Sequence, residues 1–298
     1  MYITSKHKKY IVMGLTPALF FYLVLVIWPI FRSFFYGFYD WNGLSKPIYI
    51  GVQNFVDILT DGIFWLSFKN NIFIVVASIF GQVPLGLILA IILNRKLRGA
   101  SFFRSVFFIP MILSTVVIAL LWSTILNSQT GLVNSFLQAA GLGALAQDWL
   151  GEPKIAMYTV STVVIWQFIG FYMIIFLAAL QNIPVDIMEA AEIDGASECQ
   201  KLLMITLPML WTTVKTAVIL CIAGSMRSFD LVFVMTQGGP AHMTELMATY
   251  MYNKTFSVYK YGYGSAISLV IFIISFGFIL ISQKLMGHSQ VDEEEGGV

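Results

Sequence analysis

A polar stretch, residues 186–208, carries the most informative pattern of charged and small residues in an otherwise apolar sequence. Pro184 and Asp186 are suited to open a short helix, because proline fits the first helical turn and an acid there is stabilised by the helix dipole. Gly195 is suited to end that helix, since glycine tolerates the left-handed backbone that closes many helices. The pattern predicts a helix, a turn and a second short helix that expose small alanines among charges, and no covalent chemistry.

Rare polar and aromatic side chains inside two apolar stretches form a second group of interest. Within a membrane such groups face a cavity or a neighbouring helix, because exposing them to lipid is costly. Amide, hydroxyl and aromatic groups also suit a solute that presents hydroxyls and apolar ring faces. The candidate solute contacts are Trp166, Gln167, Tyr172, Ser225, Phe229 and Asp230.

Each of these residues has a structural alternative. Aromatic side chains such as Trp166 often pack against helices or lipid, and Gln167 would be satisfied equally well by a hydrogen bond to another helix. Arg227 and Asp230 lie three residues apart and could pair with each other at the outer surface. Four further residues mark either helix kinks around a pore or close helix packing: Gln82, Pro84, Gly86 and Pro110.

The sequence patterns of several enzyme classes are missing. There is no G-x-x-x-x-G-K-[ST] phosphate loop, so the chain is not expected to hydrolyse ATP by itself. The three histidines, His7, His242 and His288, lie in separate tails or loops, which argues against a histidine-based metal centre. A G-x-S-x-G elbow is also absent. We therefore expect no enzymatic activity, no metal and no cofactor in this chain.

Composition indicates a membrane protein. Of 298 residues, 58% are hydrophobic and 11% are charged, against roughly a quarter charged in soluble domains. A net charge of +1 offers no basic surface for nucleic acid. A helix needs about 20 residues to cross the hydrocarbon core. The segments that meet this requirement are 11–31, 70–94, 105–126, 155–182, 207–228 and 261–283. The prediction is an all-α polytopic membrane protein with six transmembrane helices, in a single transmembrane domain over residues 1–298.

Charge distribution predicts the orientation of these spans. An even number of spans places both termini on one side, and that side has nine basic residues in about 56 loop residues, against six in about 97 opposite. Both termini and the loop 186–206 are therefore predicted to be cytoplasmic in a bacterial inner membrane, and the outer segments to be loops and short interfacial helices. An autonomous secondary transporter is an alternative, but it would need an intramembrane carboxylate, and only Asp230, at a membrane edge, is available.

The anchor residues of the polar stretch have a specific spacing. Glu189-Ala190-Ala191, three residues, Gly195, nine residues, Ile205, one residue, then Leu207-Pro208 resembles the EAA motif of ABC importer permeases at every anchor position. In that family the loop inserts into a cleft of the ATPase subunit. The resemblance implies this coupling role for Glu189, Ala190, Ala191, Asp194, Gly195, Ile205, Leu207 and Pro208. Leu202 and Met188 depart from the family pattern, which usually has aromatic residues there.

A second motif narrows the resemblance. Phe229-Asp230, five residues, Thr236, one residue, then Gly238-Gly239-Pro240 follows the fifth predicted span. Together with the EAA spacing it is similar to the MalF/UgpA-type permeases of carbohydrate ABC importers, which have the type I permease fold.

The resemblance implies a function and a set of partners. The chain would be the permease subunit of an ATP-driven importer and would form the pathway for a sugar or oligosaccharide delivered by an extracytoplasmic binding protein. Its other partners would be a second homologous permease, membrane lipid and two ABC ATPase subunits that hold ATP and Mg. Glycerol-3-phosphate or another non-sugar solute is the alternative cargo.

Overall fold

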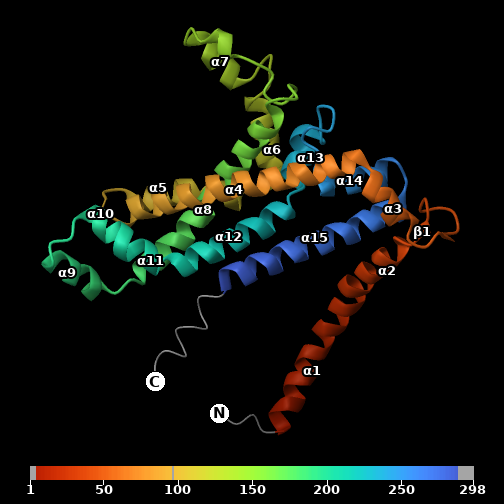
Figure 1. The fold of residues 1–298 in the computed structure, drawn as a ribbon, viewed down its shortest axis with the longest axis horizontal. Helices are drawn as coiled ribbons and strands as arrows, with labels where there is room; N and C mark the ends of the chain where they lie inside the picture. The colour runs from red at the N-terminus through yellow and green to blue at the C-terminus, as the bar shows by residue number, and fades with distance from the viewer. Residues whose placement is uncertain (1–4, 96, 288–298) are drawn as a thin grey trace. The chain divides into compact units, whose positions relative to one another are not determined.

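The computed structural model describes residues 5–95 and 97–287 and is built almost entirely of helices, which confirms the all-α prediction (Figure 1). Lys96, counted for the predicted orientation, and His288 lie outside the described residues. The chain divides into two compact units. One comprises Met1–Asp61 with Met251–Ile273, and the other comprises Gly62–Tyr250 with Ile274–Val298.

The first unit begins with a long apolar helix. Its pieces are α1 (Ser5–Tyr22), the π-helical η1 (Leu23–Ile27) and α2 (Trp28–Tyr36). An antiparallel hairpin of β1 (Tyr39–Asp40) and β2 (Ile48–Tyr49), then α3 (Gln53–Thr60), follow. The buried Asn54 side chain donates to the carbonyl oxygens of Gly37 and Tyr39 at 2.9 and 3.0 Å. The hairpin was not among the predicted loops and short helices, because two-residue strands leave no alternating sequence pattern.

The second unit holds most of the remaining helices. In chain order they are α4 (Gly62–Asn94), α5 (Ala100–Ile112), α6 (Thr115–Ile125), α7 (Leu132–Ala139), η2 (Gly143–Leu145), α8 (Ala156–Gln181), α9 (Val185–Ile193), α10 (Glu198–Gln200), η3 (Lys201–Thr206), α11 (Leu207–Met209), α12 (Trp211–Met226) and α13 (Asp230–Thr236). Then come α14 (Met247–Tyr252), η4 (Asn253–Ser257) and α15 (Tyr261–Gly287). Of these, η4 belongs to the first unit, and α14 and α15 contribute residues to both units.

Close packing of α4 against α8 forms the centre of the second unit. A Cβ atom at Gly86 would lie 2.8 Å from the Cβ of Tyr172 and 3.0 Å from the nitrogen of Met173. Because α4 continues unbroken through Pro84, the structure favours close packing over a kink in this helix. On the other side of α8, Gly170 faces the backbone of α5.

Four of the six predicted spans are continuous helices long and apolar enough to cross a membrane. They are Met13–Tyr36, Gly62–Asn94, Ala156–Gln181 and Tyr261–Lys284. The second of them begins eight residues before the predicted start at 70. The spans predicted at 105–126 and 207–228 correspond to bent helix pairs, Ala100–Ile112 with Thr115–Ile125 and Glu198–Met209 with Trp211–Met226. Within the described residues the number of spans reaches six if each bent pair counts as one.

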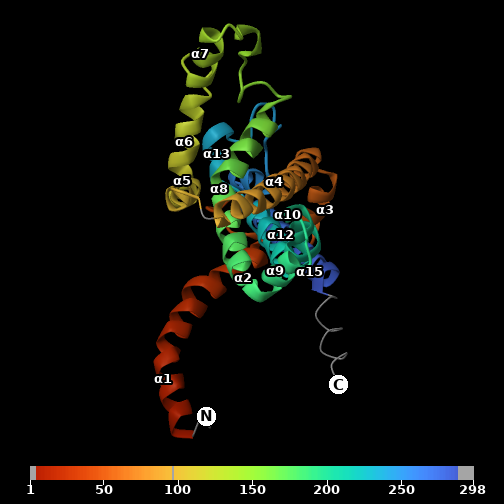
Figure 2. The same ribbon diagram turned by 90° about the vertical axis from the view of Figure 1, so that its left-hand side faces the viewer.

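The bend in the third span lies between α5 and α6, which meet at 100°. Leu113 and Ser114 there have extended ψ angles of 150° and 130°. Pro110 weakens the last turn of α5, because it has no backbone N–H to donate. A hydrogen bond of 3.2 Å from the Gln167 side chain to Thr115 fixes the start of α6 on α8. Figure 2 shows α6 rising from its bend with α5.

The bend in the fifth span lies at Leu210, where Glu198–Met209 meets Trp211–Met226 at 62°. Pro208 therefore belongs to the end of the loop helix, and does not begin the span as the sequence suggested. It lacks the N–H for a normal helical bond, and the π-helical turn Lys201–Thr206 precedes it. Both features bend helices.

Candidate functional sites

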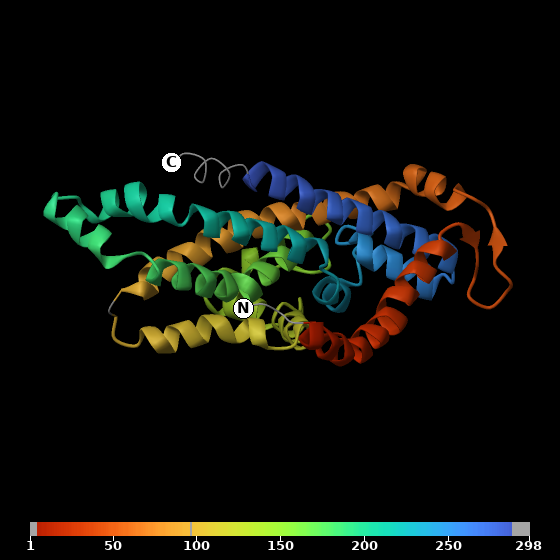
Figure 3. The same ribbon diagram turned by 90° about the horizontal axis from the view of Figure 1, so that it is seen from below.

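The polar stretch folds as the predicted helix, turn and helix, at the left-hand end of Figure 3 in green and teal. Helix α9 follows Pro184, with Asp186 in its first turn. Gly195 lies just beyond it with a left-handed φ of +74°. The second helix opens with a capping box: Ser197 accepts from the backbone N–H of Gln200, and the Gln200 side chain accepts from the backbone N–H of Ser197 at 2.8 Å.

Lys201 ties the two helices of this loop together. Its Nζ lies 2.8 Å from Oε1 of Glu192 on α9 and also contacts Oε1 of Glu198 on α10. The lysine side chain is 8% exposed, whereas both carboxylates are largely exposed. Hydrogen bonds to Glu192 and Glu198 raise the pKa of Lys201, and the hydrogen bond from Lys201 lowers the pKa of Glu198. The ion pair between Lys201 and Glu192 therefore stabilises the turn, in addition to the left-handed backbone of Gly195.

Most predicted coupling residues are accessible. Glu189, Ala190, Asp194, Gly195 and Pro208 are exposed, Ile205 and Leu207 are partly buried, and Ala191 is buried. Apolar side chains protrude beside them: Ile193 is 87% exposed and Met204 is 73% exposed. Apolar groups grouped with small residues and charges on one loop are typical of a protein interaction surface.

Two of the predicted solute contacts line a cavity of about 170 Å³ between α4, α5, α8 and α12. Tyr172 and Ser225 lie in its wall with Ser228 and Gln82. The Gln82 amide donates to the Val164 carbonyl at 3.2 Å. Aromatic rings and Met111 form much of the remaining wall. The cavity therefore combines hydroxyl and amide groups with apolar faces.

The structure does not bring Trp166 or Gln167 into this cavity. Trp166 packs edge to face against Trp122 of α6, at 5.3 Å between ring centroids. Gln167 is fully buried and donates to Thr115, as the alternative of an interhelical bond predicts. Its Oε1 accepts no hydrogen bond within the described residues.

Phe229 and Asp230 also lie outside the cavity lining. Phe229 stacks on Phe233 at 4.9 Å, and Asp230 is exposed in the first turn of α13. Among the ion pairs of the described residues none joins Arg227 to Asp230, so the alternative of a local pair is not observed.

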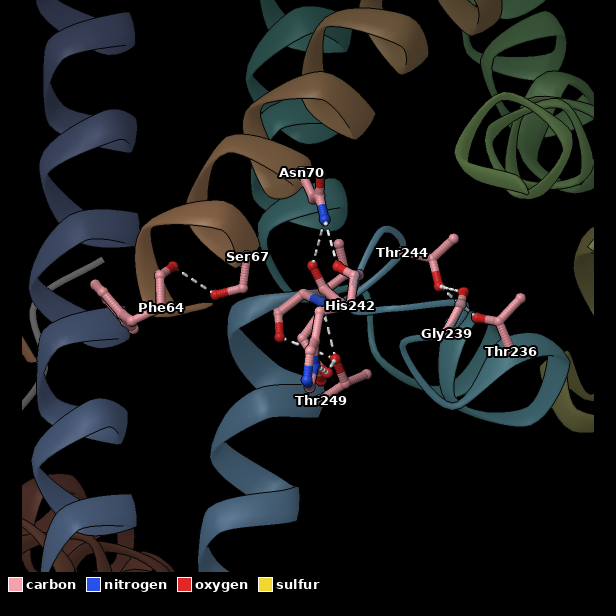
Figure 4. A network of polar contacts seen from close by, with 10 residues as sticks. Phe64, Ser67, Asn70, Thr236, Gly239, His242, Thr244 and Thr249 are labelled. Carbon is pink, nitrogen blue, oxygen red and sulfur yellow. Dashed lines mark hydrogen bonds and ion pairs between the residues drawn. The ribbon is translucent and has the colours of Figure 1, made fainter. Parts of the chain in front are cut away.

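The second motif closes on a buried carboxylate, Glu245, which is 2% exposed. Figure 4 shows the polar network around it, with His242, Thr249 and Asn70 labelled. Thr249 donates to Oε1 of Glu245 at 2.7 Å, and Nδ1 of His242 lies 2.8 Å from Oε2. Gly238 has a φ of +84°, and a Cβ atom there would lie 2.6 Å from Oε2 of Glu245. Any larger side chain at position 238 would collide with the Glu245 carboxylate, which explains why the motif has glycine there.

Hydrogen bonds fix the rest of this loop to itself and to α4. Thr236 and Thr244 have hydroxyl oxygens 2.7 Å apart, and Thr244 donates to the Gly239 carbonyl. The Asn70 amide donates to the Glu245 carbonyl at 2.9 Å. Asn71 Oδ1 accepts from the Met247 backbone at 2.8 Å. The motif therefore anchors the segment after α13 on the beginning of α4.

Sequence reasoning did not identify three roles that the structure shows. These are the ion pair of Lys201, the place of Gln82 in the cavity wall and the buried carboxylate of Glu245. The three-residue spacing of Glu198 and Lys201 indicates a pair on one helix, but the bond to Glu192 needs the turn. Gln82 was interpreted as a marker of a helix kink or of close packing and not as part of a cavity wall, although a buried amide in an apolar helix needs a partner. Glu245 follows its motif by five residues and has no distinguishing local pattern.

The fold agrees with two solved structures. One is a bacterial ABC transporter involved in the import of the acidic polysaccharide alginate, with a TM-score of 0.84, 21% identity and coverage of 96% of this chain and 97% of the other. The second is the bacterial alginate ABC transporter in complex with alginate pentasaccharide-bound periplasmic protein, with a TM-score of 0.82, 22% identity and 94% coverage of both chains. The chain therefore shares the fold of these two transporter chains.

The chain belongs to the family described as binding-protein-dependent transport system inner membrane component, whose model matches residues 82–286. It is 38% identical to the probable ABC transporter permease protein YurN of Bacillus subtilis, over 91% of this chain and 93% of the relative. It is 32% identical to the trehalose/maltose transport system permease protein MalF of Thermococcus litoralis, over 95% and 97%. It is 34% identical to the multiple sugar-binding transport system permease protein MsmF of Streptococcus mutans, over 85% and 86%. The resemblance stated from the motifs is confirmed.

Proposed function

We propose that this chain is the permease subunit of an ATP-driven importer and forms the pathway for a sugar or oligosaccharide delivered by an extracytoplasmic binding protein. The observation that carries the proposal is the exposed EAA loop, closed at Gly195 and presenting Ala190 and Ile193 on a family-matched permease fold. The names of MsmF and MalF support a sugar as cargo.

The proposed assembly supplies the energy that this chain does not. A second homologous permease completes the pathway, and two ABC ATPase subunits hold ATP and Mg. When the ATPase dimer closes, the two coupling loops move together and the pathway opens outward. The solute enters from the binding protein, and hydrolysis of ATP returns the pathway to its inward-facing form. All covalent chemistry lies in the ATPase subunits.

The solute pathway of this chain is proposed to pass the cavity lined by Tyr172 and Ser225. Hydroxyl groups with aromatic faces suit a sugar, which offers both hydroxyls and apolar ring faces. The cavity holds about 170 Å³ in this chain by itself. The second permease is expected to complete the solute site. Trp166, Gln167, Phe229 and Asp230 then support the helices around it.

The proposed orientation places both termini and the coupling loop in the cytoplasm. Cys199 in this loop is exposed and Cys221 is buried, so a membrane-impermeant maleimide should label Cys199 alone. We expect labelling in inside-out vesicles stripped of peripheral subunits, and none in intact spheroplasts. Cys199→Ser provides the background. Labelling of Cys199 from outside would reverse the orientation.

The experiment that tests the function is purification followed by reconstitution. We expect mild detergent to extract this chain from its host with an ATPase and a second permease, identified by mass spectrometry. In proteoliposomes the complex should accumulate a radiolabelled sugar only with the binding protein and ATP. Uptake of glycerol-3-phosphate in place of sugars would show that the proposed solute is wrong, whereas the proposed importer assembly would stand. Recovery of the chain without an ATPase in several detergents would indicate an autonomous carrier.

The same uptake assay includes a control for the cavity. Ser225→Leu narrows the cavity and removes a hydroxyl from its wall. Loss of a hydrogen bond to the solute, about 1 to 3 kcal/mol where a buried group is left unpaired, predicts a loss of uptake of about tenfold or more at unchanged membrane content. Thr216→Leu lies on the same helix α12 at an exposed position and should leave uptake near the parent rate. Equal uptake by all three proteins would remove this cavity from the pathway.

A further inference from the structure

The coupling loop has little support from the helices above it. A cavity of about 390 Å³ separates its two helices from the ends of α4 and α8. Asn94 and Gln181 line the upper side of this cavity, and Met188 and Lys201 line the loop side. Because this cavity leaves the loop without close packing on that side, contacts within the loop contribute to the angle between its two helices.

Three kinds of contact are available within the loop. Backbone hydrogen bonds from Gly195 to Glu192 and from Ala196 to Ala191, at 3.1 and 2.9 Å, close the end of α9. The capping box at Ser197 starts the second helix. Neither contact sets the relation of one helix to the other, because each is confined to one helix end.

The bond between Lys201 and Glu192 is different, because it joins side chains nine residues apart on the two helices. Glu198 also contacts Lys201, but the two residues lie three apart on the same helix and so constrain only that helix. The Lys201 side chain is 8% exposed. An ammonium group so buried needs carboxylate partners to remain charged at low cost.

We propose that Lys201 is a positioning residue for energy coupling, which acts through its cross-turn bond to Glu192 to hold the two loop helices at the angle that fits the ATPase. This inference rests on the coupling role proposed above. Without the bond, the loop would still form and would still dock. It would rotate about Gly195, and closure of the ATPase dimer would be transmitted less completely to α12, which continues from the second loop helix.

The test uses the complete importer in proteoliposomes and measures the number of solute molecules taken up per ATP hydrolysed. Glu192→Gln removes the carboxylate that pairs with Lys201 across the turn. Glu198→Gln removes the carboxylate that pairs with Lys201 within the same helix, so the two variants form a matched pair. We expect about a tenfold fall in the ratio for Glu192→Gln, the size of effect produced by losing a hydrogen bond between charged groups. Glu198→Gln should stay within about twofold of the parent.

Two further variants separate positioning from direct contact with the ATPase. Lys201→Met should lower the ratio as Glu192→Gln does, and Lys201→Arg should retain it, because the guanidinium can reach the same carboxylate. The exchanged pair Glu192→Lys with Lys201→Glu should recover at least half of the parent ratio. Failure of the exchanged pair to recover, or equal ratios for the two glutamine variants, would overturn the inference.

The outcome also distinguishes this inference from the proposed function. If Lys201→Met keeps the parent ratio while Gly195→Asp stops uptake, the loop couples transport and Lys201 does not position it. If neither change alters ATP-driven uptake, the coupling role itself is wrong. Amounts of ATPase recovered with each variant are measured in parallel, so that lost assembly is not mistaken for lost coupling.

Discussion

Gly195→Asp is expected to abolish solute uptake while the protein remains folded in the membrane. A Cβ atom at this position meets nothing within 4 Å, so the fold has room for the new side chain. The left-handed φ of +74° costs a non-glycine residue about 1 kcal/mol, and Asp tolerates it better than most. In the proposed assembly the larger effect lies at the ATPase, where an unpaired carboxylate would be buried. That costs about 3 to 5 kcal/mol, which corresponds to a loss of docking on the order of a hundredfold or more.

Gly195→Asn separates the charge from the shape of the new side chain. Asparagine has nearly the same volume and adopts the left-handed region readily, so it should retain measurable uptake. Membrane content, ATPase co-purification and uptake are measured for both variants. Parent-level uptake by Gly195→Asp at normal membrane content would contradict the assignment of residues 186–206 as the coupling loop.

The helix, turn and helix of residues 186–206 were predictable from sequence because their signals are local. Pro184, Asp186 and Gly195 act on the backbone within a turn of their own positions, and the structure places each as predicted. The same is true of the four continuous spans, whose length and lack of charge suffice to identify them. Both kinds of signal depend on neighbouring residues in the chain and on little else.

The two bends were not predictable in this way. The 100° bend between α5 and α6 depends on Thr115 receiving a hydrogen bond from Gln167, 52 residues later in the chain. Pro110 alone left both a kink and close packing open. At Gly86 the packing alternative holds, and near Pro110 the helix breaks, although both positions have helix-weakening residues in the sequence. The helix surface that packs against each position decides whether the helix continues or breaks. The local sequence pattern does not contain that information.

The candidate solute contacts show the same limit. Tyr172 and Ser225 meet at one cavity because α8 and α12 pack together, whereas Gln167 lies five residues before Tyr172 on a different face and bonds to α6. The type of side chain made each of these residues an equally good candidate for a solute contact. Only the rotation of each helix about its axis, set by packing at residues such as Gly86, separates a cavity wall from a buried structural bond.

Gly170→Ala is expected to lower the thermal stability of the protein strongly. A Cβ atom at Gly170 would overlap the carbonyl oxygen of Phe107 and lie 2.9 Å from the Cα of Phe108. Both are backbone atoms of α5, so no rotamer change can relieve the contact and the whole helix must move. Overpacking of this kind costs about 1 to 3 kcal/mol and occasionally more. The melting temperature of the detergent-purified protein, followed by tryptophan fluorescence, should fall by several degrees.

The matched control for Gly170→Ala is Gly277→Ala, another glycine inside a helix of the second unit. A Cβ atom at Gly277 meets nothing within 4 Å, and alanine is favoured over glycine in helices by about 1 kcal/mol, so its melting temperature should stay level or rise. The two changes are chemically identical, so a difference between them reports the contact of α8 with α5. Because Met111 of α5 and Tyr172 of α8 share the cavity wall, Gly170→Ala should also reduce uptake. Equal melting temperatures for the two variants would mean that α5 and α8 are not held at this distance.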